Sequence, residues 1–163
     1  MDRKYNKHYE DSVIVKSDPV KVFVYSDDHT NFSSHMNKSS WMMGGGKMNA
    51  HIDDKKFQQP GSHLQMEGTV FGIKLYLDEV ITKREPSFKK EWETVGKLNL
   101  VVIDHYRLGY EIKPENEGSK IRVYIDYDLP KSAKTLWLGV LFGGMYAKWC
   151  VNQMINGVKE NFV

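Results

Sequence analysis

Between about Lys47 and Leu129, hydrophobic and polar residues alternate with a period of two, which is the side-chain repeat of a β-strand. The clearest run is 121–128, and the runs 73–78, 88–94 and 105–112 alternate in the same way. One polar face and one apolar face are typical of an antiparallel sheet that is covered on a single side. The pattern therefore predicts a meander of about six strands.

The N-terminal part predicts one further strand and two short helices. Residues 12–16 are expected to form the strand. Asp18 can then accept a hydrogen bond at a helix start, and Pro19 already has the φ angle of a first helical residue. A second short helix, capped by Asp28 or Thr30, is expected to follow.

A long C-terminal helix is predicted to cover the apolar face of the sheet. After Leu129-Pro130 the chain runs to Phe162 without another proline. Such a helix would reach about 40 Å at ~1.5 Å per residue, which is enough to cross the sheet. Its small and apolar residues recur at spacings of three and four and form one stripe. The stripe consists of Leu136, Val140, Gly143, Ala147, Cys150, Met154 and Val158.

The first half of this helix is apolar outside the stripe as well, at Trp137, Leu138, Leu141 and Met145. Surplus apolar surface of this kind marks a homodimer contact, a membrane-surface contact or a ligand portal. The alternative is that the two short helices and Trp41 cover these side chains.

Three glycines, at 139, 143 and 144, lie in the same half of the helix. Each costs about 1 kcal/mol relative to alanine in a helix interior, so a local reason is expected. A close approach to the sheet, a kink or room for a ligand would each supply one. Because the glycines cluster, we expect a break near Gly143-Gly144.

Composition and length argue against several kinds of binding partner and metal site. The 163 residues include 23 Lys plus Arg and 21 Asp plus Glu, which gives a formal net charge of +2. Without a basic block, a nucleic-acid partner is not expected. The one cysteine, Cys150, excludes an intrachain disulfide and a multi-cysteine metal site, and no metal or cofactor is predicted. The length predicts a single domain over 1–163, with 1–8 as a flexible N-terminal extension.

The chain carries no obvious targeting or membrane-spanning signal. Residues 1–11 are polar and charged, unlike a signal peptide. The longest uncharged stretch, 135–147, is shorter than the ~20 apolar residues that span a bilayer. A cytoplasmic location is therefore expected.

Three groups of residues carry a family resemblance that extends over nearly the whole chain. They are Asp18–Phe23 with Asp27-Asp28; Gly72–Val80 with Glu85-Pro86 and Lys90–Trp92; and Tyr110–Pro114 with Gly118–Ile121. With the order of elements, they resemble the helix-grip superfamily, which includes START-like lipid-transfer domains and the polyketide cyclase/dehydrase-like (SRPBCC) proteins. The resemblance implies an α+β fold with a curved antiparallel sheet of about seven strands, in the order β-α-α-β-β-β-β-β-β-α.

The same resemblance implies an elongated cavity between sheet and helix that holds a sterol, lipid, isoprenoid or aromatic polyketide. Pockets for apolar ligands are lined by apolar side chains with a few polar groups that fix orientation. The alternative is that the inward side chains fill a dry core. Parity and the helical stripe give the lining as Leu75, Leu77, Trp92, Tyr106, Leu108, Val123, Ile125, Val140, Gly143, Ala147 and Met154.

Three polar residues, Glu79, Lys90 and Asp104, share the parity of these inward apolar positions. If residues 84–87 connect two strands, Glu79 and Lys90 are diagonal neighbours and can pair. Alternatively, these positions lie at sheet ends or beyond a bulge and are solvated. A buried carboxylate without a compensating charge has a raised pKa and becomes an acid/base candidate. The catalytic candidates are then Asp104, Tyr106, Glu79 and Lys90.

The leading hypothesis is binding or transport of a small hydrophobic ligand, with Tyr106, Trp92 or Asp104 orienting its polar end. The competing hypothesis is a cyclase, dehydratase or hydrolase that uses the same cavity for acid/base chemistry. A third is a membrane-associated or stress-response accessory protein without chemistry.

Overall fold

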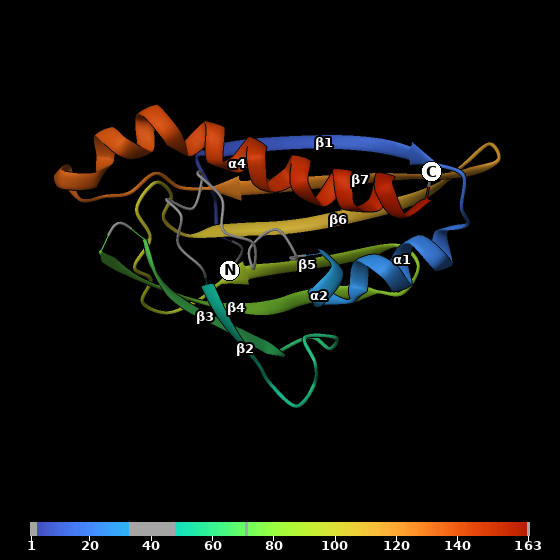
Figure 1. Cartoon of the computed structure of the whole chain (residues 1–163), viewed down its shortest axis with the longest axis horizontal. Helices are drawn as coiled ribbons and strands as arrows, with labels where there is room; N and C mark the ends of the chain where they lie inside the picture. The colour runs from blue at the N-terminus through green and yellow to red at the C-terminus, as the bar shows by residue number, and fades with distance from the viewer. Residues whose placement is uncertain (1–2, 33–47, 71, 163) are drawn as a thin grey trace.

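The computed structural model describes residues 3–32, 48–70 and 72–162. One curved sheet carries a long C-terminal helix across one face, with two short helices beside it (Figure 1). The elements are β1 (Lys7–Val15), α1 (Pro19–Asp27), α2 (His29–Phe32), β2 (Met48–Ile52), β3 (His63–Val70), β4 (Ile73–Glu85), β5 (Lys89–Thr94), β6 (Tyr106–Glu115), β7 (Gly118–Tyr127) and α4 (Ala133–Phe162).

The seven strands form a single antiparallel sheet in the order β1-β7-β6-β5-β4-β3-β2. Strands β2 to β7 follow one another as a meander, and β1 is added to the free edge of β7. This arrangement confirms the predicted α+β helix-grip class, including the two short helices and the long final helix.

Residues 3–8 are attached to the sheet. Lys7 and His8, predicted as part of an N-terminal extension, are the first residues of β1. Before them, the Arg3 guanidinium donates to the Asp128 carboxylate at 3.0 Å, and the Asn6 amide donates to it at 2.8 Å.

The starts of the short helices follow from their capping residues. The Asp18 side chain accepts a hydrogen bond from the Lys21 backbone N–H at 3.0 Å, and Pro19 is the first helical residue of α1, as predicted. At α2, the Asp28 carboxylate accepts from the Thr30 backbone N–H at 2.9 Å. The predicted cover by Trp41 lies outside the described residues.

Alternation of buried and exposed side chains divides the sheet into an inner face toward α4 and an outer face. Directly paired residues share a face, and one row of pairs runs across four strands through Ile81, Trp92, Leu108 and Ile125. All four are at most 4% exposed. Burial of such rows against a helix is the main source of stability for this type of sheet.

Helix α4 is continuous over Ala133–Phe162 and lies along β1 and β7 (Figure 1). The predicted break near Gly143-Gly144 is therefore wrong. The glycines instead allow the connection between β5 and β6 to approach the helix closely. A Cβ at Gly143 would lie 2.9 Å from the Val102 carbonyl oxygen. At Gly139 it would lie 2.4 Å from Pro130. None of the helices in the described part of the chain has both the length and the hydropathy needed to traverse a bilayer.

The adjacent pair Gly143 and Gly144 gives a matched test of this packing. Gly143→Ala should lower the free energy of unfolding by about 1–3 kcal/mol, because the added methyl group must displace the Val102 backbone. Gly144→Ala should raise it by up to about 1 kcal/mol, since its Cβ meets only the Tyr127 hydroxyl at 3.6 Å and alanine favours helix. Urea unfolding measures both. An equal gain in the two variants would show that α4 does not pack on Val102.

Candidate functional site

A polar row crosses the inner face of the sheet beneath α4. Glu79 in β4 lies opposite Thr94 in β5, and Tyr106 follows on β6. The Tyr106 hydroxyl reaches past Thr94 and donates a hydrogen bond to Glu79 Oε1. The Thr94 hydroxyl accepts from the Tyr106 backbone N–H at 3.0 Å, which fixes the strand that carries the tyrosine. The row thus brings a carboxyl group and a phenol together inside the protein.

Apolar side chains surround this pair. Leu77 and Ile81 flank Glu79 along β4, and Trp92 and Leu108 occupy the next row; all four are at most 4% exposed. From the opposite side, α4 contributes Tyr146 and Cys150, which are four residues apart on the helix and near enough to Tyr106 to affect its pKa.

Burial controls the protonation of every group in this cluster. Desolvation raises the pKa of Glu79 from 4.5 to about 7, although the Tyr106 hydroxyl and the Trp92 indole oppose the shift. Desolvation and the nearby Glu79 raise the pKa of Tyr106 well above its usual 10. Desolvation also raises the pKa of the Cys150 thiol to about 12. Near neutral pH, Glu79 is therefore the one member of the cluster that exchanges a proton.

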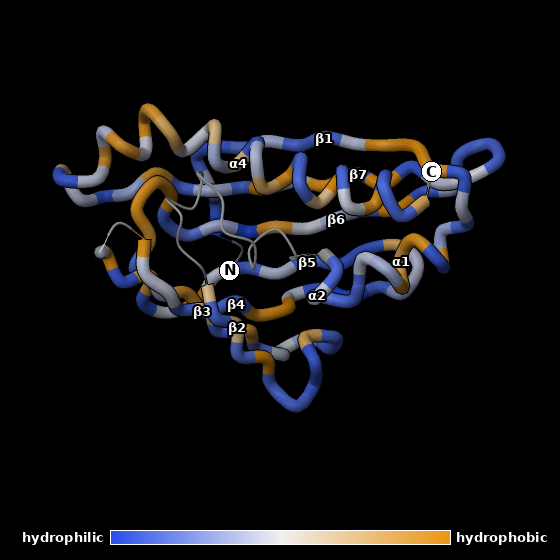
Figure 2. Tube along the Cα trace, viewed as in Figure 1, coloured by the Kyte–Doolittle hydropathy of each residue, from blue (hydrophilic) through white to orange (hydrophobic). Residues whose placement is uncertain are grey.

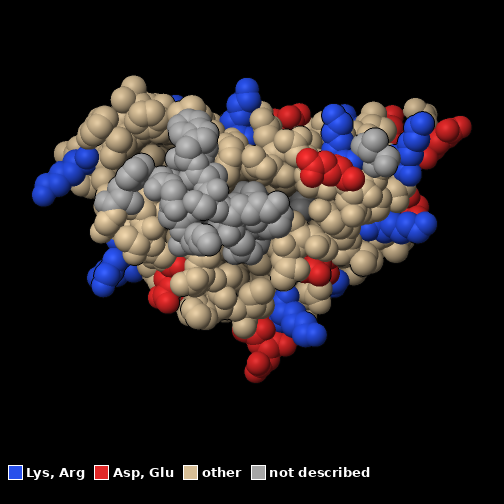
Figure 3. Space-filling view, viewed as in Figure 1, with Lys and Arg blue, Asp and Glu red and all other residues tan. Residues whose placement is uncertain are grey.

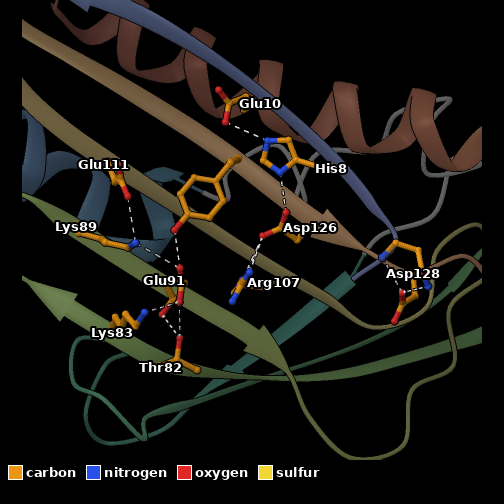
Figure 4. A network of polar contacts seen from close by, with 12 residues as sticks. His8, Glu10, Thr82, Lys83, Lys89, Glu91, Arg107, Glu111, Asp126 and Asp128 are labelled. Atoms are coloured by element: carbon orange, nitrogen blue, oxygen red, sulfur yellow. Dashed lines mark hydrogen bonds and ion pairs between the residues drawn. The ribbon is translucent and has the colours of Figure 1, made fainter. Parts of the chain in front are cut away.

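The outer face holds a buried carboxylate with a very different environment. Glu91 accepts a hydrogen bond from the Tyr124 hydroxyl at 2.6 Å, and its oxygens lie 3.6 Å from Lys89 and 3.8 Å from Lys83 (Figure 4). Tyr124 lies over Gly109, where a Cβ would come within 2.6 Å of its hydroxyl oxygen. Two cations and a phenol thus satisfy Glu91.

Asp27, at the end of α1, is satisfied in the same way. Arg84 donates to it through two nitrogens, the shorter contact being 2.8 Å, and Lys90 Nζ lies 3.1 Å from its carboxylate. Lys90 also donates to the backbone carbonyls of Asp27 and Phe57. Desolvation lowers the pKa of Lys90, and Asp27 opposes that shift.

Glu79 is the exception among the buried carboxylates of the described residues. Asp128, like Asp27 and Glu91, has a cationic partner, because Arg3 lies 3.0 Å from it. No lysine, arginine or histidine of the described part lies within ion-pair distance of Glu79, and its Oε2 has no hydrogen-bond partner there. Buried carboxylates are normally paired, so an incompletely satisfied one calls for a specific explanation.

The expected Glu79–Lys90 pair is wrong, and so is the alternative in which both residues are solvated. Both side chains are at most 3% exposed, but they face different partners. The two strands are connected by residues 86–88, not 84–87, and a bulge between Ile81 and Lys83 adds a further shift, so that Lys90 lies opposite Arg84. Lys90 and Thr94 are then four positions apart in β5, about 13 Å along the strand.

Asp104 lies outside the polar row. It precedes β6, where its backbone N–H donates to the Asp128 carbonyl at 2.8 Å. Its partly exposed carboxylate lies 3.2 Å from His105 Nδ1. The structure therefore brings Glu79 and Tyr106 together but not Asp104 or Lys90.

Most of the apolar lining residues lie in the interior, and one does not. Val140 is 64% exposed, because Gly139 and Gly143 occupy the side of α4 that faces the sheet. Leu75 is partly buried. The remaining predicted residues are buried: Leu77, Trp92, Tyr106, Leu108, Val123, Ile125, Gly143, Ala147 and Met154.

Sequence reasoning missed two members of the cluster, Tyr146 and Thr94. Tyr146 follows Gly143 by three residues, so helical spacing could have placed it beside the stripe. Thr94 shares the parity of Trp92, but a threonine at that position carries no chemical signal of its own. In residues 3–32, 48–70 and 72–162, no group of three or more His, Cys, Asp or Glu side chains is arranged to hold a metal ion.

Comparison with known proteins identifies the fold. No protein-family model and no curated protein matches the chain. Among solved structures, the Zhui aromatase/cyclase from Streptomyces sp. R1128 matches with a TM-score of 0.67 and 10% identity, over 93% of this chain and 90% of that one. Truncated norcoclaurine synthase from Thalictrum flavum matches with a TM-score of 0.64 and 10% identity, over 97% and 94%. Ara h 8.0201 matches with a TM-score of 0.53 and 12% identity, over 92% and 98%. The chain therefore has the helix-grip fold that its sequence resembles.

The burial of Glu79 predicts a particular dependence of stability on pH. The folded protein keeps a proton on Glu79 between pH 4.5 and about 7, where the unfolded chain has released it. The free energy of unfolding should therefore fall as the pH rises through this window, by on the order of 3 kcal/mol in total. Glu79→Gln should abolish this component.

Urea unfolding of both proteins at several pH values between 5 and 8 tests the prediction. Glu85→Gln, at an exposed position of the same strand, is the control and should keep the wild-type profile. Parallel profiles for wild type and Glu79→Gln would contradict the assignment.

Proposed function

We propose that the protein binds a small hydrophobic ligand between the inner face of the sheet and α4, with Glu79 and Tyr106 contacting its polar end. The observation that carries this proposal is the buried carboxyl group of Glu79, which among the described residues has no cation within ion-pair distance and no hydrogen-bond partner for its Oε2. A ligand hydroxyl or carbonyl group would satisfy that oxygen. Folded proteins tolerate such local inconsistencies mainly at functional sites.

The chemistry of the pair suits a neutral polar group. A protonated Glu79 donates one hydrogen bond, and an ionised Glu79 only accepts, so the pair can match either a carbonyl or a hydroxyl group. The surrounding Leu77, Trp92 and Leu108 would contribute affinity at about 25 cal/mol per Å² of apolar area removed from water, less the costs of association. A lipid, isoprenoid or polyketide-like molecule combines these features.

The solved structures give related support. One match, with a TM-score of 0.64 and 9% identity, is norcoclaurine synthase in complex with dopamine and hydroxybenzaldehyde. Both compounds combine an aromatic ring with polar substituents. A protein with this fold thus holds small molecules that carry both a ring and polar groups, which supports the proposal.

A second candidate function is acid/base catalysis of a cyclase or dehydratase kind at the same site. The specific observation in its favour is the pKa of Glu79, about 7, because a general acid or base is most effective when its pKa is near the working pH. The effect of one substitution on turnover and on binding distinguishes the two functions. Glu79→Gln would abolish turnover of an aromatic polyketide in the enzyme while leaving an apolar ligand bound.

Binding can be tested with two probes that differ by one hydroxyl group, 2-naphthol and naphthalene. Wild type should bind 2-naphthol about fivefold more tightly, because one additional hydrogen bond contributes about 1 kcal/mol. Tyr106→Phe, which keeps the ring, should remove most of this preference. The exposed Tyr76→Phe is the control and should retain it.

Equilibrium dialysis measures the affinities, and native mass spectrometry of the purified protein tests for a co-purified apolar molecule. Failure of both probes to bind, together with a spectrum of protein alone, would overturn the proposal.

A further inference from the structure

The first three turns of α4 expose large apolar side chains that nothing in the described part of the chain covers. Trp137, Val140 and Leu141 are 57 to 64% exposed, and Met145 is 42% exposed. In Figure 3, the surface over the first turns of α4 shows few charged atoms apart from those at its tip, whereas Lys, Arg, Asp and Glu are more frequent at the opposite end. Figure 2 shows that the connection between β5 and β6, at the same end, is hydrophobic as well.

Two lysines frame this apolar surface. Lys134, Trp137, Leu141, Met145 and Lys148 follow one another at spacings of three, four, four and three residues, so they lie on one face of the helix. Both lysines are exposed. We call this face the lysine-framed stripe. The segment 129–159 contains no aspartate or glutamate, so no acidic side chain offsets these charges within α4 up to that point.

We propose that the lysine-framed stripe docks the protein onto an anionic membrane surface, with α4 lying in the plane of the interface. A helix that combines Trp and Leu on one face with lysines beside them is typical of interfacial binding. The lysine stems can lie along the apolar surface while the ammonium groups reach anionic headgroups. This docking is independent of what the interior binds.

A second copy of the chain fits the stripe less well. Leu141 lies midway between Lys134 and Lys148, so an antiparallel contact of two stripes would place Lys134 of one copy near Lys148 of the other. A parallel contact would pair each lysine with itself. Either arrangement brings like charges together without an acid on the stripe to compensate them. An anionic bilayer supplies the missing negative charge.

Vesicle flotation tests the proposal with the whole chain. The protein should float with vesicles of phosphatidylcholine containing about 30% phosphatidylserine and should dissociate as the salt concentration rises. Lys134→Glu and Lys148→Glu should each weaken binding at least fivefold, since one lysine near an anionic surface contributes about that factor. Leu141→Ser should weaken it about tenfold through lost apolar burial.

Matched controls come from exposed residues outside the stripe. Val24→Ser in α1 and Lys159→Glu near the end of α4 should leave vesicle binding unchanged. Three results would overturn the proposal: no flotation with the anionic vesicles at low salt, equal binding by the stripe and control variants, or light scattering that shows a dimer which Leu141→Ser converts to monomer. Ligand binding measured with 2-naphthol should be unaffected by Lys134→Glu, so the two proposals fail separately.

Discussion

The carboxyl group of Glu79 is buried without a cationic partner among the described residues, and the proposed site depends on this feature. Its register in β4 places it on the inner face, Thr94 keeps the neighbouring position small, and Tyr106 reaches across to share a hydrogen bond. Apolar neighbours exclude water and raise its pKa to about 7. Asp27 and Glu91 are buried to a similar extent but have basic partners, so burial of carboxylates in this fold does not by itself leave them unsatisfied.

Helix α4 connects this interior with the surface. One side of the helix carries Tyr146 and Cys150 toward the polar row, and Gly139 and Gly143 allow it to lie close to Val102. The other side, in the same turns, carries an exposed apolar stripe between two lysines. A protein that bound an apolar ligand inside and a membrane surface outside would use the two sides of one helix for both tasks.

Sequence patterns predicted the elements well, because parity and helical spacing are local properties. They placed Glu79, Tyr106 and Lys90 on the inner face correctly. Which residues these three side chains contact depends on long-range geometry. The short connection 86–88 and a bulge after Ile81 set the register of Lys90, and its partner is Asp27 at the end of α1. The glycines of α4 suggested a break, but the contact with Val102, set by tertiary packing, explains Gly143 without one. The hydrogen bond from Tyr106 to Glu79 joins β6 to β4 across β5. Sequence patterns that predict pairing of adjacent strands do not reveal such a contact.

The most direct test of the central claim is a titration of the Glu79 carboxyl carbon by NMR in protein labelled with ¹³C at glutamate, with Glu79→Gln used to assign the resonance. A buried carboxyl group beside Tyr106 should titrate near pH 7 in the free protein, and an apolar ligand with a hydroxyl group should shift that midpoint. A midpoint near 4.5 that is insensitive to ligand would mean that water reaches this carboxylate, and the proposed site would lose its basis.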